Sequence, residues 1–305
     1  MVVLLVFLSF AIFSLSYLAP GSALNAMLGT RPRTPELVHA LQVEYHLNES
    51  FFMQYWHWAG NALHLDFGTS IQSSTPVTDQ IKSRLPISLF LGTYAFLLTL
   101  IIGILLGVAA ALHKDRILDR ATVAGSAIAV GVPPFVSGVF ALYLLAIVLP
   151  IFPVAGGGTG FTDELLHLTL PAFALSFTAV ALVVRYTRTA VVAVLDQDYV
   201  TFARARGLST RRVLATYVIR NALIPIVTVS GLLFATFITG AVIVESTFSI
   251  SGIGSLLIQS VNMKDLPMLQ GVALVIAVTI ILANLVADLI YLAVDPRIRI
   301  GRRQK

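Results

Sequence analysis

The sequence has no cysteine and little charge. Without cysteine, the chain can form no disulfide, no thiolate nucleophile and no metal site built on sulfur. Charged residues make up only 11% of the chain, against about 25% in a soluble globular domain. No Gly-Lys-Ser or Gly-Lys-Thr follows the glycine run Gly156–Gly158 or occurs elsewhere, so the chain has no phosphate-binding loop of that type. The run is interpreted as a flexible turn.

Long apolar runs are what the sequence has instead. Hydrophobic residues make up 57% of the chain and the mean hydropathy is +0.89. Apolar runs of about eighteen residues or more indicate membrane-spanning helices. We predict an all-α, polytopic membrane protein with an uncleaved first helix (residues 1–19), an extracytoplasmic loop or cap (20–85) and a five-helix core (86–305). The six predicted spans are residues 2–18, 86–112, 121–151, 169–194, 222–248 and 267–294.

The basic residues set the expected orientation. Fifteen of the twenty lysines and arginines fall after the second span, around the loop between the fourth and fifth spans, and in the C-terminal tail. Cytoplasmic loops carry the excess of lysine and arginine, so both termini are predicted to be cytoplasmic. The net charge of +5 thus reflects membrane topology and does not indicate nucleic-acid binding.

The first loop carries both tryptophans and four of the six histidines. Two segments, PELVHALQVEYHL and SFFMQYWHWAGNALH, have helical spacing, so the loop is predicted to fold as a small cap. The histidines raise the hypothesis of a metal site. However, His57 and His64 are seven residues apart and no carboxylates are arranged around them, which favours surface histidines.

The third span is interrupted by GVPPFVSG (Gly131–Gly138). Two prolines with flanking glycines break or kink a helix. At membrane depth such a break is tolerated only against protein or a water-filled cavity. The break therefore either lines a substrate path or serves packing.

The basic segment (Asp196–Asn221) lies between two apolar blocks and contains five arginines. We predict two short helices separated by a tight turn. Asp198 is expected to cap the first helix, Gly207 to take the left-handed conformation that ends it, and Ser209 or Thr210 to cap the second. Such an exposed helical hairpin, with small residues interleaved among its arginines, predicts a docking surface for another protein on the cytoplasmic side.

The spans contain no constellation of catalytic residues. Their candidate acids are Glu245, near the outer end of the fifth span, and Asp288, in the inner third of the sixth. An ion-coupled secondary carrier using these two acids is an alternative hypothesis. They lie toward opposite faces with no acid between them, and no clear inverted repeat is visible.

Seven motifs in order resemble the membrane-spanning permease subunits of dipeptide, oligopeptide and nickel ABC importers, over nearly the whole chain. The resemblance implies the type I importer permease fold. It rests on LAPG (Leu18–Gly21), DFGTS (Asp66–Ser70) followed by PVTDQIKSRLPISLFL, GVPPFVSG, LTLPAFAL (Leu168–Leu175), DYVTFARARGLSTRRVLATYVIRNALIP (Asp198–Pro225), GAVIVESTFSISGIGSLL (Gly240–Leu257) and DLIYLAVDPRIRI (Asp288–Ile300).

The resemblance implies that the basic segment is the family's EAA loop, with a coupling helix that contacts an ATPase subunit. The Glu-Ala-Ala triplet corresponds to Thr201-Phe202-Ala203, so only its last residue is kept, and the family's basic N-terminal residues are missing. The implied coupling residues are Tyr199, Phe202, Ala203, Arg204, Ala205, Arg206, Gly207 and Leu208.

By the same resemblance, the chain works by alternating access in the inner cell membrane. Implied partners are a homologous second permease, two ATPase subunits that bind ATP and magnesium, an extracytoplasmic binding protein and membrane lipid. The chain itself would bind no cofactor and have no catalytic activity. Short peptides are the expected substrate, with nickel or another small solute as the alternative. The first loop is expected to meet the binding protein. The expected path residues are Pro133, Pro134, Phe135, Ser137, Glu245 and Phe248.

Overall fold

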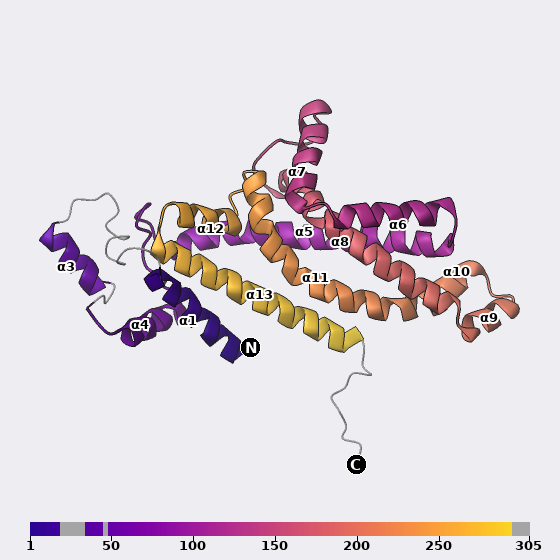
Figure 1. Cartoon of the computed structure of the whole chain (residues 1–305), viewed down its shortest axis with the longest axis horizontal. Coiled ribbons are helices and arrows are strands. Elements are labelled where there is room, and N and C mark those ends of the chain that lie inside the picture. Colours follow the sequence, from indigo (N-terminus) through magenta and orange to yellow (C-terminus); the bar gives the residue numbers. More distant parts are fainter. Residues whose placement is uncertain (19–33, 45–47, 295–305) are drawn as a thin grey trace, which may run out of the picture. The chain divides into compact units, whose positions relative to one another are not determined.

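The computed structural model describes residues 1–18, 34–44 and 48–294, and these are helical almost throughout (Figure 1). Within these ranges the only extended pairing is an isolated bridge between Thr69 and Pro76. The all-α class predicted from the apolar runs is therefore confirmed. In chain order the elements are α1 (Val2–Leu18), α3 (Pro35–Glu44), α4 (Phe51–Leu63), α5 (Val77–Leu112), α6 (Ile117–Val130), α7 (Pro134–Leu142), α8 (Phe161–Leu195), α9 (Asp198–Ala205), α10 (Thr210–Val213), α11 (Arg220–Thr247), α12 (Ile253–Asn262) and α13 (Leu266–Val294), with π-helical stretches η1 (Tyr143–Val148) and η2 (Leu214–Ile219).

Four described helices are long and apolar enough to cross a membrane: α5, α8, α11 from Pro225 on, and α13 to Ile290. The bent pair of α6 with α7–η1 raises the number to five if it counts as one span. The 17-residue α1 is apolar but shorter. The multi-pass character is thus confirmed, whereas the count of six and the location of the termini stay predictions.

Two helices begin earlier than the apolar runs predict. Helix α5 starts at Val77 and continues through Pro86, and α8 starts at Phe161 and continues through Pro171. A proline removes one backbone hydrogen bond, but the helix persists when packing holds it on both sides. Ile81 and Ser88 are buried on either side of Pro86, and Leu168 and Leu170 precede a buried Pro171.

Helix α12 lies between the fifth and sixth predicted spans, in the connection of residues 249–266. Its buried side chains include Ile253, Leu256 and Ser260, so one face packs while the other stays open. The backbone N–H of Ile253 donates to Ser88 Oγ at 2.8 Å. The helix has only ten residues. Because the sequence around it is also apolar, its amphipathic pattern does not stand out, and the sequence alone does not predict it.

Contacts divide the described residues into two compact units. The first comprises residues up to Ser88 together with Ser251–Ile281. Its core contains Phe67, Val77, Ile81, Ile253, Leu256, Met268 and Val272. In this core Gly271 is required, because an added Cβ would come within 3.0 Å of Val77 and Phe67 side-chain atoms.

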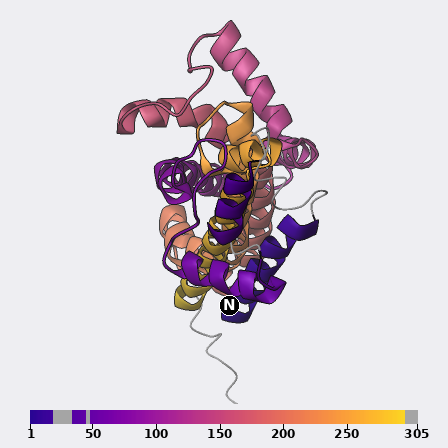
Figure 2. The same ribbon diagram turned by 90° about the vertical axis from the view of Figure 1, so that its left-hand side faces the viewer.

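The second unit comprises Leu89–Ile250 and the described residues from Leu282 on. Helix α8 is its centre, since α6, α7 and α11 all pack against it. Between α6 and α7 the chain bends by 106°, and both views show α7 turning sharply away from α6 (Figures 1 and 2). The break predicted at Gly131–Gly138 is confirmed.

Candidate functional site

The basic segment folds into the predicted hairpin of two short helices. The first, α9, ends in a Schellman turn: Gly207 has φ +78° and its N–H donates to Arg204 O at 2.9 Å, while Leu208 N–H donates to Ala203 O at 3.3 Å. The left-handed conformation predicted for Gly207 is therefore confirmed. The predicted cap is displaced by one residue, because Gln197 occupies the N-cap and Asp198 lies in the first turn. There its carboxylate still faces the positive end of the helix dipole.

The second limb of the hairpin runs on into a long helix. Ser209 occupies the N-cap of α10, as one of the two predicted options, although its side chain donates or accepts no capping hydrogen bond. From Thr210 the helix passes through the π-helical stretch η2 into α11 without a break. The hairpin is consequently continuous with the transmembrane helix that follows it.

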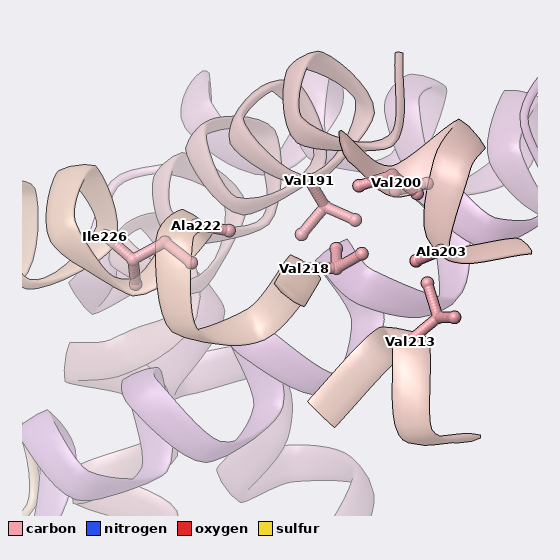
Figure 3. Close-up of a cluster of buried hydrophobic side chains, with 8 residues drawn as sticks. Val191, Val200, Ala203, Val213, Val218, Ala222 and Ile226 are labelled. Atoms are coloured by element: carbon pink, nitrogen blue, oxygen red, sulfur yellow. The ribbon is translucent and has the colours of Figure 1, made fainter. Parts of the chain in front are cut away.

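A buried apolar cluster holds the inner face of the hairpin (Figure 3). Val200 and Ala203 from α9 point towards Val191 at the end of α8 and towards Val213 and Val218 on the second limb, as Figure 3 shows. All are at most 5% exposed. Because valine and alanine are small, the two limbs and α8 approach closely. The hairpin is thereby packed onto the end of α8 within the second unit.

The outer face of α9 is open to solvent. Of the eight predicted coupling residues, Ala203 is buried in the cluster and Leu208 packs partly against it. The other six are exposed: Tyr199, Phe202, Arg204, Ala205, Arg206 and Gly207. Phe202 stands out because 68% of it is exposed on a helix otherwise rich in charge. A large exposed aromatic residue of this kind is typical of an interface anchor.

The arginines of the hairpin surround this aromatic residue with positive charge. All five are exposed, and none forms an ion pair with a residue that the structure describes. The five are Arg204, Arg206, Arg211, Arg212 and Arg220. Because unpaired guanidinium groups offer several donors each, the surface is suited to an acidic protein partner.

Two ion pairs connect the segment after α5 to the C-terminal part of α8 and to Asp196, the residue that follows it. Arg188 on α8 binds the buried Asp119 of α6 through both oxygens, with Nη2 to Oδ2 at 2.7 Å and Nε to Oδ1 at 2.5 Å. Asp119 also accepts the N–H of Asp115 at 2.9 Å. Lys114 lies 3.7 Å from Asp196, in an exposed pair of little strength. The sequence does not predict the ion pair of Asp119 with Arg188. In the segment HKDRILDR only the basic residues enter the prediction of topology.

Helices α5 and α8 also pack closely against each other. An added Cβ at Gly103 would lie 2.7 Å from Val183, and one at Gly107 would lie 2.5 Å from Thr187. The two glycines form a Gly-x-x-x-Gly pattern, which lets helices approach in membranes. Thr187 is fully buried, and its Oγ1 has no hydrogen-bond partner among the residues that the structure describes.

The break between α6 and α7 is stabilised by α8. Thr178 Oγ1 donates to the carbonyl of Val132 at 3.0 Å, which satisfies an acceptor that the broken helix leaves free. Pro133 is the N-cap of α7 and Pro134 its first residue, where a proline costs no hydrogen bond. Both prolines thus have a structural reason to be there.

The six predicted path residues separate into two groups. Pro133 and Phe135 are exposed, Phe135 by 47%, and Pro134 is half-buried. Ser137, Glu245 and Phe248 are buried. Ser137 Oγ donates to Pro134 O at 2.9 Å, with Ala174 O at 3.4 Å as a longer alternative. The ring of Phe248 packs on Gly138, so α7, α8 and the end of α11 meet there.

A second polar site lies in the first unit. Asp265, 3% exposed, accepts Ser70 Oγ–H at 2.5 Å and the N–H groups of Met268 and Gln72 at 3.3 and 3.4 Å. Asp265 directly precedes α13 and so caps it. A cavity of about 110 Å³ opens beside this carboxylate, lined by Arg84, Gln80 and Gln259 among others. The DFGTS motif thereby fixes the turn before α5 to the start of α13.

The candidate metal ligands and the two acids of the spans lie as follows. In the ranges that the structure describes, no three histidine or acidic residues are grouped as a metal would need. Glu245 is fully buried, whereas Asp288 is exposed on α13. The two acids of the secondary-carrier hypothesis therefore occupy dissimilar environments.

Comparison with known proteins identifies the family. Residues 103–300 match the family described as "Binding-protein-dependent transport system inner membrane component". The chain is 37% identical to the oligopeptide transport system permease protein AppB of Bacillus subtilis, over 92% of this chain and 90% of the relative. It is 34% identical to the dipeptide transport system permease protein DppB of Escherichia coli, over 94% and 92%.

Solved structures agree on the fold. An inward-facing structure of the MetNI methionine ABC transporter superposes with a TM-score of 0.58 at 14% identity, covering 70% of this chain and 96% of the solved one. A chain of an amino acid ABC transporter superposes with a TM-score of 0.52 at 20% identity, covering 70% and 94%. With its apolar spans and its family match over most of the core, the chain belongs to the inner-membrane components of binding-protein-dependent transport systems.

Proposed function

We propose that the chain is the permease subunit of an ATP-driven importer of short peptides. Family membership and two relatives named as oligopeptide and dipeptide permeases support this substrate class. The observation that carries the proposal is the division of α9 into two faces. Val200 and Ala203 are packed into the chain's own core, while Phe202 and the arginines are left open for a partner.

In this proposal an ATPase subunit receives the outer face of α9 in a cleft. Phe202 inserts its ring and the exposed arginines meet acidic groups at the rim. A homologous permease and a second ATPase complete the transporter, and ATP and magnesium bind to the ATPases only. This chain supplies no catalytic residue. It converts closure of the ATPases into movement of the helices that follow the hairpin.

The importance of Phe202 can be measured directly. Truncating an exposed anchor of this size costs about 2 kcal/mol of binding, roughly a 30-fold loss of affinity. Phe202→Ala should therefore reduce copurification of the ATPase without lowering the amount of permease in the membrane. Thr201→Ala is the matched control, since Thr201 is an exposed neighbour on the same helix. Equal copurification by both variants would contradict the anchor role.

For the transport path, we propose that the exposed residues of the break line it and that the buried ones support them. Pro133 and Phe135 are available on the surface of the isolated subunit, which is where a path shared with a second permease would run. Ser137 and Phe248 hold α7 against α8 and α11 from behind. Phe135→Ala should alter peptide selectivity, whereas Phe248→Ala should lower stability.

The experiment that tests the function is reconstitution of the chain with its second permease, both ATPases and the binding protein. We expect ATP hydrolysis stimulated by peptide-loaded binding protein, together with ATP-dependent uptake of labelled di- and oligopeptides. Uptake of nickel without peptide uptake would favour the alternative substrate. Solute movement by the chain alone, driven by a proton or sodium gradient, would overturn the proposal and direct attention to Glu245 and Asp288.

The first extracytoplasmic loop is proposed to meet the binding protein. Its length before α5 and its own helices α3 and α4 support this role. Deleting α3 should weaken docking of the binding protein in a pull-down from membranes while insertion of the permease is unchanged. Unaltered docking would place the contact elsewhere.

A further inference from the structure

Helix α4 presents a continuous apolar stripe to its surroundings. Phe52, Trp56 and Leu63 are 72%, 73% and 85% exposed, and Met53 is 52% exposed. With about 100° of rotation per residue, these four side chains fall within a sector of about 100° on one side of the helix. Isolated exposed apolar residues are ordinary, but a contiguous stripe of large ones marks an interaction surface.

The rest of α4 divides into two other sectors. His57 and Asn61, one turn apart, are exposed and polar, and His57 lies 3.2 Å from Glu49. On the third side Tyr55 and Trp58 pack against α1 through ring contacts with Phe13 at centroid distances of 5.7 and 5.6 Å. The helix thus has a water-suited sector, a sector packed on protein and an apolar sector that the described residues leave largely exposed.

The apolar stripe continues onto the surface of α1. The exposed ring of Phe52 stacks on Phe10 of α1, with centroids 6.4 Å apart and planes 14° apart. Towards its N-terminus α1 exposes further apolar side chains, including Val3 at 83% and Phe7 at 67%. Helix α1 carries no charged residue along its length. Such an uncharged, apolar surface is suited to lipid, and the stripe of α4 extends it.

The level of the contact along α1 places α4 near one edge of the bilayer. Figures 1 and 2 together show α4 crossing α1 instead of running alongside it. The contacts with α1 are made by Ser9, Phe10 and Phe13. Phe13, Phe10 and Ser9 lie five, eight and nine residues before Leu18, the last described residue of α1, or roughly 8 to 14 Å at 1.5 Å per residue. Amphipathic helices that lie in the interface bury their apolar face by about 5–10 Å, which matches the Phe13 end of this range, and tryptophan and tyrosine are enriched there.

We propose that α4 is an interfacial helix that lies on the membrane surface and inserts Phe52, Trp56 and Leu63 among the lipids. It anchors the first extracytoplasmic loop to the bilayer beside α1. The partner is thus the phospholipid bilayer itself, at the boundary between headgroups and acyl chains. Neither the family match, which begins at residue 103, nor the transport reaction assigns this role to the segment.

The two tryptophans of the chain make a direct test possible, because both are on α4. In Trp58→Phe, Trp56 is the sole tryptophan. The full-length variant is placed in phosphatidylcholine nanodiscs that contain lipids with a nitroxide in the headgroup, high on the acyl chain or near its end. We expect the nitroxide high on the chain to remove more than about half of the Trp56 emission, and aqueous iodide to remove little. Strong quenching by iodide with none by lipid nitroxides would overturn the proposal.

The reverse variant, Trp56→Phe, is the control for packing. It leaves Trp58, whose ring lies against Phe13 and Tyr55 and should be shielded from iodide. Exposure of Trp58 to iodide would mean that α4 has left α1, which would also contradict the proposal.

A second, independent test uses the absence of cysteine. Asn61→Cys on the polar sector should react with a membrane-impermeant maleimide in intact nanodiscs, and Phe52→Cys should react at least about tenfold more slowly, because thiolate chemistry requires water. After transfer to a denaturing detergent both should react equally. Equal rates in nanodiscs would show that the stripe faces water or a site free for a soluble partner, and would refute insertion in lipid.

Discussion

Replacing Gly207 separates two contributions to the turn of the basic segment. The residue has φ +78°, and an added Cβ would meet no atom within 4 Å. Gly207→Ala therefore introduces backbone strain without a clash, at about 1–2 kcal/mol for a residue with a side chain in the left-handed region. This lowers the ratio of correctly formed to disrupted hairpin roughly 5- to 30-fold. Gly207→Asn should fall between wild type and alanine, because asparagine tolerates that conformation.

Gly207→Pro adds the loss of a hydrogen bond. Proline fixes φ near −65° and has no N–H, so the bond to Arg204 O at 2.9 Å is lost and the observed turn cannot form. The cost is about 3 kcal/mol or more, which is over about 100-fold in the same ratio. We expect peptide uptake and ATPase copurification to be lost while membrane levels of the permease stay normal.

Thr210→Pro is the matched control for the proline change. Thr210 is exposed and is the first residue of α10, where a proline is favourable. The preceding Ser209 has φ −61° and ψ 147°, which is the conformation preferred before proline. Transport should survive in this variant. Normal transport by Gly207→Pro would refute the docking role of the turn, and equal loss in both variants would refute the conformational argument.

Further predictions concern the helices that carry the hairpin, each tested by the temperature at which the detergent-solubilised chain aggregates. Asp119→Asn removes the charge that the partly exposed Arg188 binds, so it should cost about 1.5–3 kcal/mol, whereas replacing both residues by apolar ones should cost less; wild-type stability of the single variant would contradict a role of the ion pair. Gly107→Ala should destabilise by about 1–3 kcal/mol, because its Cβ would lie 2.5 Å from Thr187, and Gly125→Ala, at an open helical position, should not. Thr187→Val removes a buried hydroxyl without a described partner and should be neutral or stabilising by about 1 kcal/mol. A marked loss of stability would show that the hydroxyl does form a hydrogen bond in the folded chain.

Features encoded by neighbouring residues could be predicted from the sequence. Gly207 ends α9 as expected, and the prolines at 133 and 134 break the third apolar run as expected, because turn chemistry and proline geometry act within a few residues. The exposed and buried faces of α9 could not be separated. That division depends on Val191 and Val218, which only the fold brings to Val200.

Features that depend on distant partners were missed for the same reason. Asp119 and Arg188 are 69 positions apart and Ser70 and Asp265 are 195 apart, so no local pattern marks either pair. The apolar runs predict helix starts that are too late, because a proline often marks a helix boundary, whereas packing on both sides carries α5 through Pro86. An acid just before a helix, as at Asp265, was the one local signal that could have been used.

The uninterrupted passage from α10 through η2 into α11 has a mechanical consequence. From Thr210 to Thr247 there are 38 consecutive helical residues, or roughly 57 Å of helix at 1.5 Å per residue. If an ATPase subunit displaces the hairpin as proposed, the displacement reaches Phe248 along one continuous stretch of helix, and there the end of α11 lies against Gly138 of α7. The π-helical stretch η2 and Pro225 both lie within that stretch, and both are features at which helices bend. On the proposed mechanism, deleting one residue of η2 should therefore change how movement of the hairpin reaches α7.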